Sequence, residues 1–294
     1  MIVAIIAPGD MGAGVGAALK AGGHDIVTCL AGRSDETRAR AARIGFRDLG
    51  DLDALVGEAD IVLSILPPAS ALGLAREVAA AMARSGARPV YLDANAVSPQ
   101  TAAEIGAVIE NAGAPFIDGG IVGPAPGKGS QPTRLYVSGD DVASAKALAV
   151  DSLMVKPLEG GVGRASALKM LYAGVNKARF SLFALVATAA EALDLRDAFE
   201  EEMRYSQAET WAYMERMIPR LPADSERWAP ELEEIGRTMQ AAGLSGEMHF
   251  GAAWILSLMA ATPLAAETRE TFDASRTLAD TLEVFVAQLR KDTG

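Results

Sequence analysis

The sequence contains very few of the residues that build disulfide frameworks, metal centres or nucleic-acid-binding surfaces. Cys29 is the single cysteine, which excludes a disulfide bond within the chain. The two histidines, His24 and His249, are far apart in the sequence, and no group of Cys and His residues has the spacing of a zinc site. Aromatic residues make up 5% of the chain, and lysines and arginines form no long run. We therefore expect no metal centre and no nucleic-acid partner.

The sequence also lacks the apolar run of about 18 residues, free of charges and helix breakers, that a membrane-spanning helix requires. The apolar start MIVAII has no preceding cationic segment and stops at Pro8-Gly9, unlike a signal peptide. The net charge of −11 favours solubility. These features predict a soluble cytoplasmic protein with a reduced thiol and no membrane partner.

Strand-like and helix-like stretches alternate along the first part of the chain. Half of all residues are hydrophobic, and short runs rich in Val, Ile and Leu alternate with longer helical stretches. Strands of this kind are buried on both faces, so the pattern predicts an α/β fold with a doubly wound, mostly parallel sheet. The predicted strands are Ile2–Ile6, Asp25–Leu30, Asp60–Ile65, Pro89–Asp93, Pro115–Asp118, Arg134–Ser138 and Ser152–Lys156. The predicted helices between them are Met11–Ala21, Asp35–Arg43, Ser70–Arg84 and Pro99–Ala112.

The pattern changes after Gly160-Gly161, where strand-like runs end. Residues 162–193 predict one long helix, and further helical stretches follow. We expect these to be interrupted by three prolines, namely Pro219, Pro222 and Pro230. The chain is therefore predicted to form an α/β domain over residues 1–160 and an all-helical domain over residues 161–294.

A glycine-rich turn, Ala7-Pro8-Gly9-Asp10-Met11-Gly12, separates the first strand from the first helix. It is an A-x-G-x-x-G version of the dinucleotide-binding fingerprint, set between a strand and a helix as that motif requires. Gly9 lets the backbone approach a pyrophosphate, and Gly12 lets the helix pack close to the strand. Free N–H groups at the start of the helix, near Asp10 and Met11, favour phosphate. The turn predicts a Rossmann-type cofactor domain rather than a turn used for packing alone.

The residues after the second strand bear on the choice between NAD and NADP. NAD-binding folds usually place an acidic residue there, to hold the ribose 2′-hydroxyl. This chain has Arg33 and Ser34, whose guanidinium and hydroxyl suit a 2′-phosphate. Alternatively, Arg33 is a solvated loop residue and Ser34 an N-cap of the next helix, and Asp35 is an acidic residue close by. We favour NADP over NAD.

Five sequence motifs follow one another along most of the chain. They are GDMG (9–12), ADIVLSILPPASA (59–71), YLDANAVSP (91–99), FIDGGIVGPAPGKG (116–129) and GRASALK (163–169). Together they resemble the β-hydroxyacid dehydrogenase family, which includes 3-hydroxyisobutyrate and 6-phosphogluconate dehydrogenases. The resemblance implies that Leu66 and Pro67 lie in a loop over the cofactor and that Asn95 contacts the cofactor.

The fourth of these motifs resembles the family's substrate loop, F-x-D-A-P-V-S-G-G. Asp118 and Gly123 match it, whereas Val122 stands in place of the substrate-holding serine and Pro124 in place of a glycine. The resemblance implies that Val122, Gly123 and Pro124 line the substrate site. The departures predict a substrate different from the family's usual ones.

Lys169 lies early in the predicted long helix, among apolar neighbours. From the pattern alone it is either a solvent-facing residue or a lysine whose pKa is lowered in a cleft for acid/base work. In the family, a lysine at the same distance from the motif's glycine, here Gly163, is the catalytic acid/base. The resemblance therefore assigns this role to Lys169. Ala173 stands where the family has an asparagine four residues later.

The sequence leaves five further residues open. Asn176 returns close to the Lys169 face of the helix after seven residues, and Tyr172 borders it, so either side chain can contact substrate or simply pack. His249 is interpreted as a core or pocket-wall residue. Arg227 and Trp228 stand near a region where the family places a cofactor-contacting lysine, but a solvated helix with a packed Trp228 is the simpler interpretation.

The sequence as a whole predicts an NADP-dependent oxidoreductase acting on a small 3-hydroxy acid or related carbonyl. An imine reductase-like enzyme and a non-catalytic NADP-binding protein are the alternatives. Imine reductases usually carry a different residue at the lysine position, so Lys169 favours carbonyl chemistry. By resemblance, we also expect a homodimer or a higher homo-oligomer.

Overall fold

The computed structural model describes residues 1–293, except for the side chain of Thr293. The chain forms two compact units, one spanning Met1–Tyr172 and the other beginning at Ala173. The division falls inside one continuous helix, α7 (Arg164–Ala192), and so beyond the boundary expected after residue 160.

The first unit is built on one eight-stranded sheet with strand order β3-β2-β1-β4-β5-β6-β7-β8. β1 to β6 are parallel, β7 is antiparallel to β6, and β8 is parallel to β7. The chain order reverses between β1 and β4, which is where open α/β sheets form a ligand-binding crevice at the carboxyl ends of their strands. The strands are β1 (Ile2–Ile6), β2 (Asp25–Thr28), β3 (Arg47–Asp48), β4 (Ile61–Ser64), β5 (Val90–Asp93), β6 (Phe116–Val122), β7 (Thr133–Ser138) and β8 (Leu153–Pro157).

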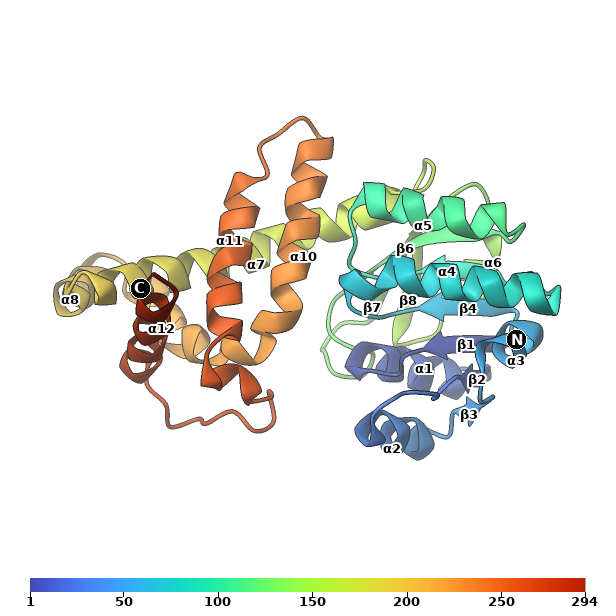
Figure 1. Cartoon of the computed structure of the whole chain (residues 1–294), viewed down its shortest axis with the longest axis horizontal. Coiled ribbons are helices and arrows are strands. Elements are labelled where there is room, and N and C mark those ends of the chain that lie inside the picture. The colour runs from blue at the N-terminus through green and yellow to red at the C-terminus, as the bar shows by residue number, and fades with distance from the viewer. Residues whose placement is uncertain (294) are drawn as a thin grey trace. The chain divides into compact units, whose positions relative to one another are not determined.

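Helices cover both faces of this sheet (Figure 1). Successive side chains of β1 enter different cores: Ala4 and Ile6 pack on one face, Val3 and Ile5 on the other. This two-sided burial is the reason for the continuous apolar strands. The first core is shared with α3 (Leu52–Glu58), α4 (Pro68–Ser85) and α5 (Pro99–Asn111). The second is shared with α1 (Asp10–Ala21), α2 (Asp35–Ile44) and α6 (Ala143–Lys146).

The structure confirms the predicted fold class and every predicted strand, within a few residues at the ends. β3, α3 and α6 were not predicted from the sequence. Each is too short to show a hydrophobic period of its own, so the surrounding packing decides its conformation.

The second unit is all-helical over the described residues. Besides the rest of α7 it contains α8 (Arg196–Ser206), α9 (Ala208–Met217), α10 (Pro222–Ala241), α11 (Glu247–Ala260) and α12 (Leu278–Thr293), with 3₁₀ turns at Ile218–Arg220 and Pro263–Ala266. The expectation that Pro230 interrupts a helix is wrong, because Pro230 lies inside α10. Pro222 does mark a boundary, as it sits in the first turn of α10, where no intrahelical N–H bond is lost.

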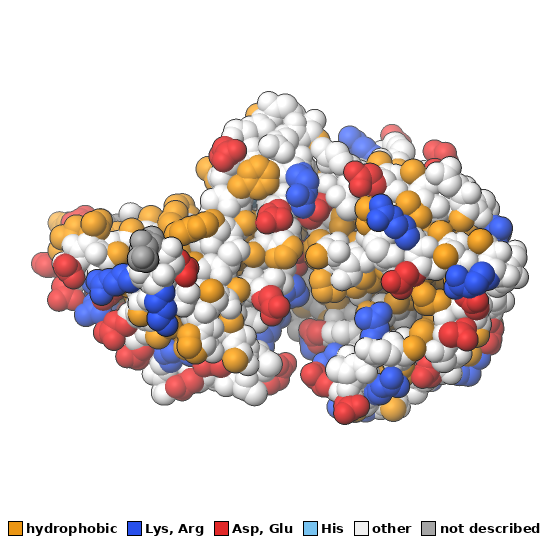
Figure 2. All heavy atoms as spheres, in the orientation of Figure 1, with side chains coloured by type: hydrophobic (Ala, Val, Ile, Leu, Met, Phe, Trp, Pro, Cys, Tyr) orange, Lys and Arg blue, Asp and Glu red, His pale blue; other side chains and the backbone are white. Residues whose placement is uncertain are grey.

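No helix among the described residues is long and apolar enough to cross a membrane. Figure 2 shows acidic and basic side chains interleaved over the visible face of both units.

Candidate functional site

The turn between β1 and α1 is as tight as its glycines predict. A Cβ atom at Gly12 would lie 2.9 Å from the carbonyl oxygen of Ala7, so a larger residue would push α1 off the strand. The N–H of Gly9 donates to that same oxygen over 2.7 Å. Ala7 itself has φ 61, in the left-handed region that disfavours a Cβ. This conformation explains why the fingerprint has glycine at that position.

Asp10 and Met11 open α1 beside this turn. Met11 packs against the apolar core under the sheet. Asp10 is exposed, and its carboxylate pairs with Lys128 Nζ over 2.6 Å. Lys128 comes from the loop between β6 and β7, so this loop reaches the start of α1. The first turn of α1 offers its N–H groups and the positive end of its dipole to an anion.

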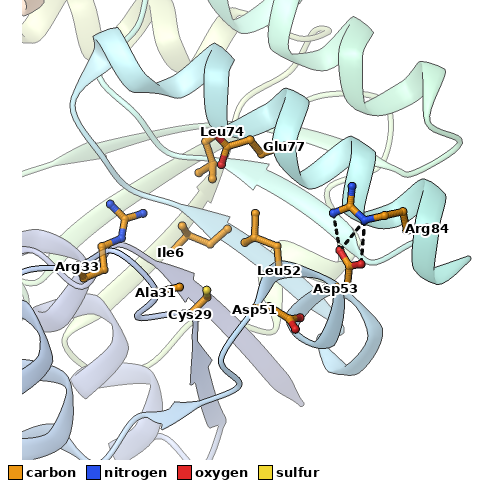
Figure 3. Close-up of a pocket in the computed structure, with 10 residues that line it drawn as sticks. All are labelled: Ile6, Cys29, Ala31, Arg33, Asp51, Leu52, Asp53, Leu74, Glu77 and Arg84. Atoms are coloured by element: carbon orange, nitrogen blue, oxygen red, sulfur yellow. Dashed lines mark hydrogen bonds and ion pairs between the residues drawn. The ribbon is translucent and has the colours of Figure 1, made fainter.

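A cavity of about 430 Å³ opens beside the carboxyl ends of β1 and β2 (Figure 3). Apolar walls come from Ile6, Leu52 and Leu74, and polar groups stand at the rim. The remaining lining residues are Cys29, Ala31, Arg33, Asp51, Asp53, Glu77 and Arg84. An apolar slot with a polar rim, next to a phosphate-binding turn, fits the adenosine half of a dinucleotide.

Arg33 and Ser34 lie in the loop that follows β2. Ser34 caps α2, since its Oγ accepts the N–H of Thr37 over 3.3 Å. Arg33 lines the cavity, and its Nε is buried without a hydrogen-bond partner. The other arginine of the cavity, Arg84, is engaged by Asp53 over 2.6 Å. A buried N–H without an acceptor is costly, so Arg33 is suited to an anionic ligand.

Asn95 ties together two of the segments predicted to hold the cofactor. It is 2% exposed, and its Oδ1 accepts the N–H of Leu66 over 2.6 Å. Its Nδ2 donates to Ser64 and Asp93. Pro67 is exposed at the start of α4, next to Leu66. Asn95 therefore supports the loop that carries Leu66 and Pro67.

The predicted substrate loop begins at the end of β6. Val122 is the last residue of β6 and is 3% exposed, so most of its side chain is packed. Gly123 has φ 109, a conformation that favours glycine. The carbonyl of Pro124 accepts a bond from Thr133 Oγ1 over 2.6 Å, which holds the loop to the start of β7.

Asp118 of β6 is fully buried and forms the cap of α7. Its Oδ2 accepts the N–H groups of Gly163 and Ala165 at 2.9 Å and of Ser166 at 3.1 Å. The hydroxyls of Ser138 and Ser166 also donate to its two oxygens, at 2.9 and 2.5 Å. The N–H groups at the start of a helix lack partners within the helix, and Asp118 supplies the acceptors from a neighbouring strand.

Lys169 stands one turn into α7 and is partly buried. The helix passes directly over Gly120 of β6: a Cβ there would lie 2.7 Å from the oxygen of Ala165 and 2.9 Å from Lys169 Cβ. Asp118 is level with Asp93, the last residue of β5, so Gly120 lies beyond that level toward the carboxyl edge of the sheet. The Lys169 backbone is thus fixed at the edge where the cofactor motifs lie.

A second buried carboxyl group, Asp93, stands between Ser64 and Asp118 in the sheet register. Burial, with the charge of Asp118 nearby, raises its pKa to about 8. Its Oδ1 accepts the N–H of Asn95, but its Oδ2 has no hydrogen-bond partner. Asp93 is therefore protonated at neutral pH.

Tyr172 is half-exposed and is the last residue of the first unit, while Asn176 lies further along α7, in the second unit. His249 is 9% exposed, and burial lowers its pKa. Its ring lies against Gly174 of α7, where a Cβ would be 3.2 Å from Nε2. This position agrees with the interpretation of His249 as a core or wall residue.

Arg227 and Trp228 lie on α10 and have partners within the second unit. Arg227 pairs with Asp224 over 2.5 Å. The ring of Trp228 stacks on Phe180, with centroids 5.8 Å apart. Lys177 Nζ lies 5.1 Å from the Trp228 ring centroid, so the tryptophan packs within a helical core.

The sequence analysis missed the roles of Gly120, Ser138 and Ser166. A signal was present in the paired glycines of FIDGG, because glycine inside a strand often marks the close approach of another backbone. It also missed the buried ion pair of Lys177 with Glu231, 2.7 Å apart, which no local pattern indicates.

Comparisons with protein-family models match both parts of the chain. Residues 2–156 match the NAD binding domain of 6-phosphogluconate dehydrogenase. Residues 190–259 match a domain of unknown function, DUF1932.

Three individual proteins are similar to this chain in sequence or structure. An uncharacterized 28.5 kDa protein in the 7S RNA 5′ region of Methanothermus fervidus is 30% identical over 177 residues, which cover 60% of this chain and 66% of that protein. A solved conserved protein of unknown function, described as structurally similar to 3-hydroxyacid dehydrogenases, is 25% identical with TM-score 0.62, covering 88% of this chain and 98% of that one. The 3-hydroxyisobutyrate dehydrogenase of Mycobacterium tuberculosis is 20% identical with TM-score 0.63, covering 98% and 99%.

Proposed function

Because the chain belongs to the family defined by the NAD binding domain of 6-phosphogluconate dehydrogenase, we propose that it is an NADP-dependent oxidoreductase of small carbonyl compounds. The predicted likeness to β-hydroxyacid dehydrogenases is confirmed at the level of the family. The proposed substrate is a small 3-hydroxy acid, or the related carbonyl compound.

The observation that carries the proposed chemistry is the placement of Lys169. Its Cβ and the backbone carbonyl of Ala165 lie against Gly120, at the carboxyl edge of the sheet that carries the cofactor motifs. The bound nicotinamide would supply or accept the hydride. In reduction, Lys169 Nζ would donate a proton to the oxygen that becomes the alcohol, and in oxidation it would accept that proton.

Two departures from the family motif support a substrate less polar than the family's usual ones. Val122 and Ala173 replace a hydroxyl and an amide that hold substrate in the family, and both are packed side chains here. We propose that Gly123, Pro124, Tyr172 and Asn176 supply the remaining contacts to the substrate.

The test is a turnover screen with purified protein. Small 3-hydroxy acids are offered with NADP⁺, the matching oxo compounds and aldehydes with NADPH, and cyclic imines with NADPH. We expect turnover in the first two groups and at most trace turnover of imines. Turnover of imines alone would refute carbonyl chemistry, and tight NADPH binding without turnover in any group would favour a non-catalytic protein.

The choice of NADP over NAD is supported by the unpaired Nε–H of Arg33 beside the adenosine cavity. An anionic 2′-phosphate would supply the acceptor that this buried group lacks. A hydrogen bond to a charged group contributes about 1.5–3 kcal/mol, which corresponds to roughly 10- to 150-fold in affinity.

We therefore expect Arg33→Gln to weaken NADPH binding by about 10- to 150-fold, and to change NADH binding by less than about threefold. Fluorescence titration of both cofactors measures this. Arg84→Gln is the matched control, because Arg84 lines the same cavity but is held by Asp53. Equal losses for both cofactors in Arg33→Gln would mean that the guanidinium does not read the 2′-phosphate, and tighter binding of NADH by the unmodified protein would contradict the preference.

A homodimer is proposed from the surface of α7. Large apolar side chains, among them Val175, Leu182, Leu185 and Val186, are exposed along this helix. Several large apolar side chains exposed on one helix support a protein interface there. We expect sedimentation velocity to show a dimer, and the double change Val175→Asp with Leu182→Asp to shift it to monomer. A monomeric unmodified protein at micromolar concentration would contradict the proposal.

A further inference from the structure

α7 is capped by a residue from another element. The residue before its first helical residue is Gly163, which has φ 97 and no side chain to cap with. The cap comes instead from Asp118, which lies 45 to 48 residues earlier in the chain and is fully buried. A local Ser, Thr or Asp would cap the helix without burying a charge. Stability alone therefore does not explain this arrangement.

The donors around Asp118 converge on one of its two oxygens. Three backbone N–H groups and the hydroxyl of Ser138 donate to Oδ2, and the hydroxyl of Ser166 donates to Oδ1. An alanine at this place would leave these donors without this acceptor. The start of α7 would then shift or lose bonds.

A second attachment point lies two residues further along β6. The absence of a Cβ at Gly120 lets the backbone of α7 approach at Ala165 and Lys169. A Cβ at Gly120 would lie 2.7 Å from the oxygen of Ala165 and 2.9 Å from Lys169 Cβ, so an alanine would displace the helix by several tenths of an ångström. Asp118 holds the start of α7, and Gly120 sets the distance between α7 and β6 at Lys169.

We propose that Asp118 and Gly120 are positioning residues that together fix Lys169 for proton transfer. The proposal rests on the proposed role of Lys169. A proton donor must come within about 3 Å of its acceptor, and a misplacement of about 1 Å costs on the order of 10²-fold in rate. The stability of the fold does not require such placement, but the reaction does.

The test compares Asp118→Ala, Gly120→Ala and Ser166→Ala with the unmodified protein. We expect kcat per folded protein to fall by roughly 10- to 100-fold in the first two variants and less in Ser166→Ala, with NADPH affinity within about threefold. A second readout needs no turnover. In the cofactor-free protein, the rate at which an amine-reactive reagent labels Lys169, followed by mass spectrometry, should change several-fold.

The matched control is Thr277→Ala, which removes a helix cap in the second unit, where Thr277 Oγ1 accepts the N–H of Asp280. It should lower the melting temperature without changing kcat per folded protein or the labelling of Lys169. If Asp118→Ala does not fold, Gly120→Ala and Ser166→Ala decide. Unchanged kcat and labelling in these two variants would overturn the inference while Lys169→Met remains inactive, whereas an active Lys169→Met would overturn the proposed function instead.

Discussion

Replacing Lys169 by methionine is expected to lower kcat by about 10²- to 10⁴-fold, the usual contribution of a positioned acid or base. Methionine keeps the apolar stem and removes only the ammonium group. Binding of NADPH should change by less than about threefold, because the proposed cofactor residues lie after β1, β2, β4 and β5 and at the start of α1 rather than on α7. Steady-state turnover, together with a fluorescence titration of NADPH, measures both quantities.

Two further measurements separate a lost proton donor from a disturbed helix. In Lys169→Ala, added methylammonium should restore part of the turnover, because the small amine can enter the space of the missing side chain. Lys146→Met is the control, since Lys146 is an exposed residue of α6. Full turnover in Lys169→Met, or a loss of NADPH binding as large as the loss of kcat, would contradict the assignment.

The sequence was sufficient for features that depend on local spacing. The turn at Gly9 and Gly12 needs small residues within one short segment, so it is visible as a motif. Lys169 was selected by resemblance to a family motif, through its distance from Gly163, and its catalytic role stays a prediction. The reason for that glycine, a positive φ at the start of α7, is equally local.

The features that hold Lys169 in place could not be predicted in this way. Asp118 was visible only as a match to a family motif, and its partners at Gly163, Ala165 and Ser166 become neighbours only when α7 packs on β6. Asn95 is a similar case. It was expected to contact the cofactor. In the structure its Oδ1 accepts a hydrogen bond from Leu66 and supports that loop, and direct contact with the cofactor stays a prediction.

Pro230 was expected from the sequence to interrupt a helix, but it lies inside α10. Proline disfavours the interior of a helix, yet α10 continues through Pro230 and packs along α11. Packing on that face outweighs the loss of one backbone hydrogen bond. Packing against the rest of the domain also decides the conformation of β3 and α6, because both are too short to be stable alone.

Asp93 gives the second large prediction, which concerns stability as a function of pH. Its carboxyl is fully buried, and burial raises its pKa from 3.8 to about 8. The groups that face it are Asp118, Asn95 and Tyr91, and Tyr91 also has a raised pKa because of burial. None of these is a cation that stabilises the charged carboxylate.

The folded protein therefore holds a proton on Asp93 between about pH 4 and pH 8 that the unfolded chain releases. Stability from this group is fully present below pH 4, falls as pH rises through this window, and is lost above pH 8. The difference between the two pKa values corresponds to on the order of 5 kcal/mol.

Asp93→Asn removes the titrating group and keeps its shape and its acceptor for Asn95. We expect the variant to be more stable than the unmodified protein at pH 9 by several kcal/mol, on the order of 3–5. At pH 5 the difference should be about 2 kcal/mol or less, because this pH lies only about one unit above the pKa of the carboxyl in the unfolded chain. Urea unfolding at both values measures the two free energies. Asp151→Asn, a change at an exposed carboxylate, controls for the general loss of negative charge. Equal stability differences at pH 5 and pH 9 would show that Asp93 is already ionised in the folded protein.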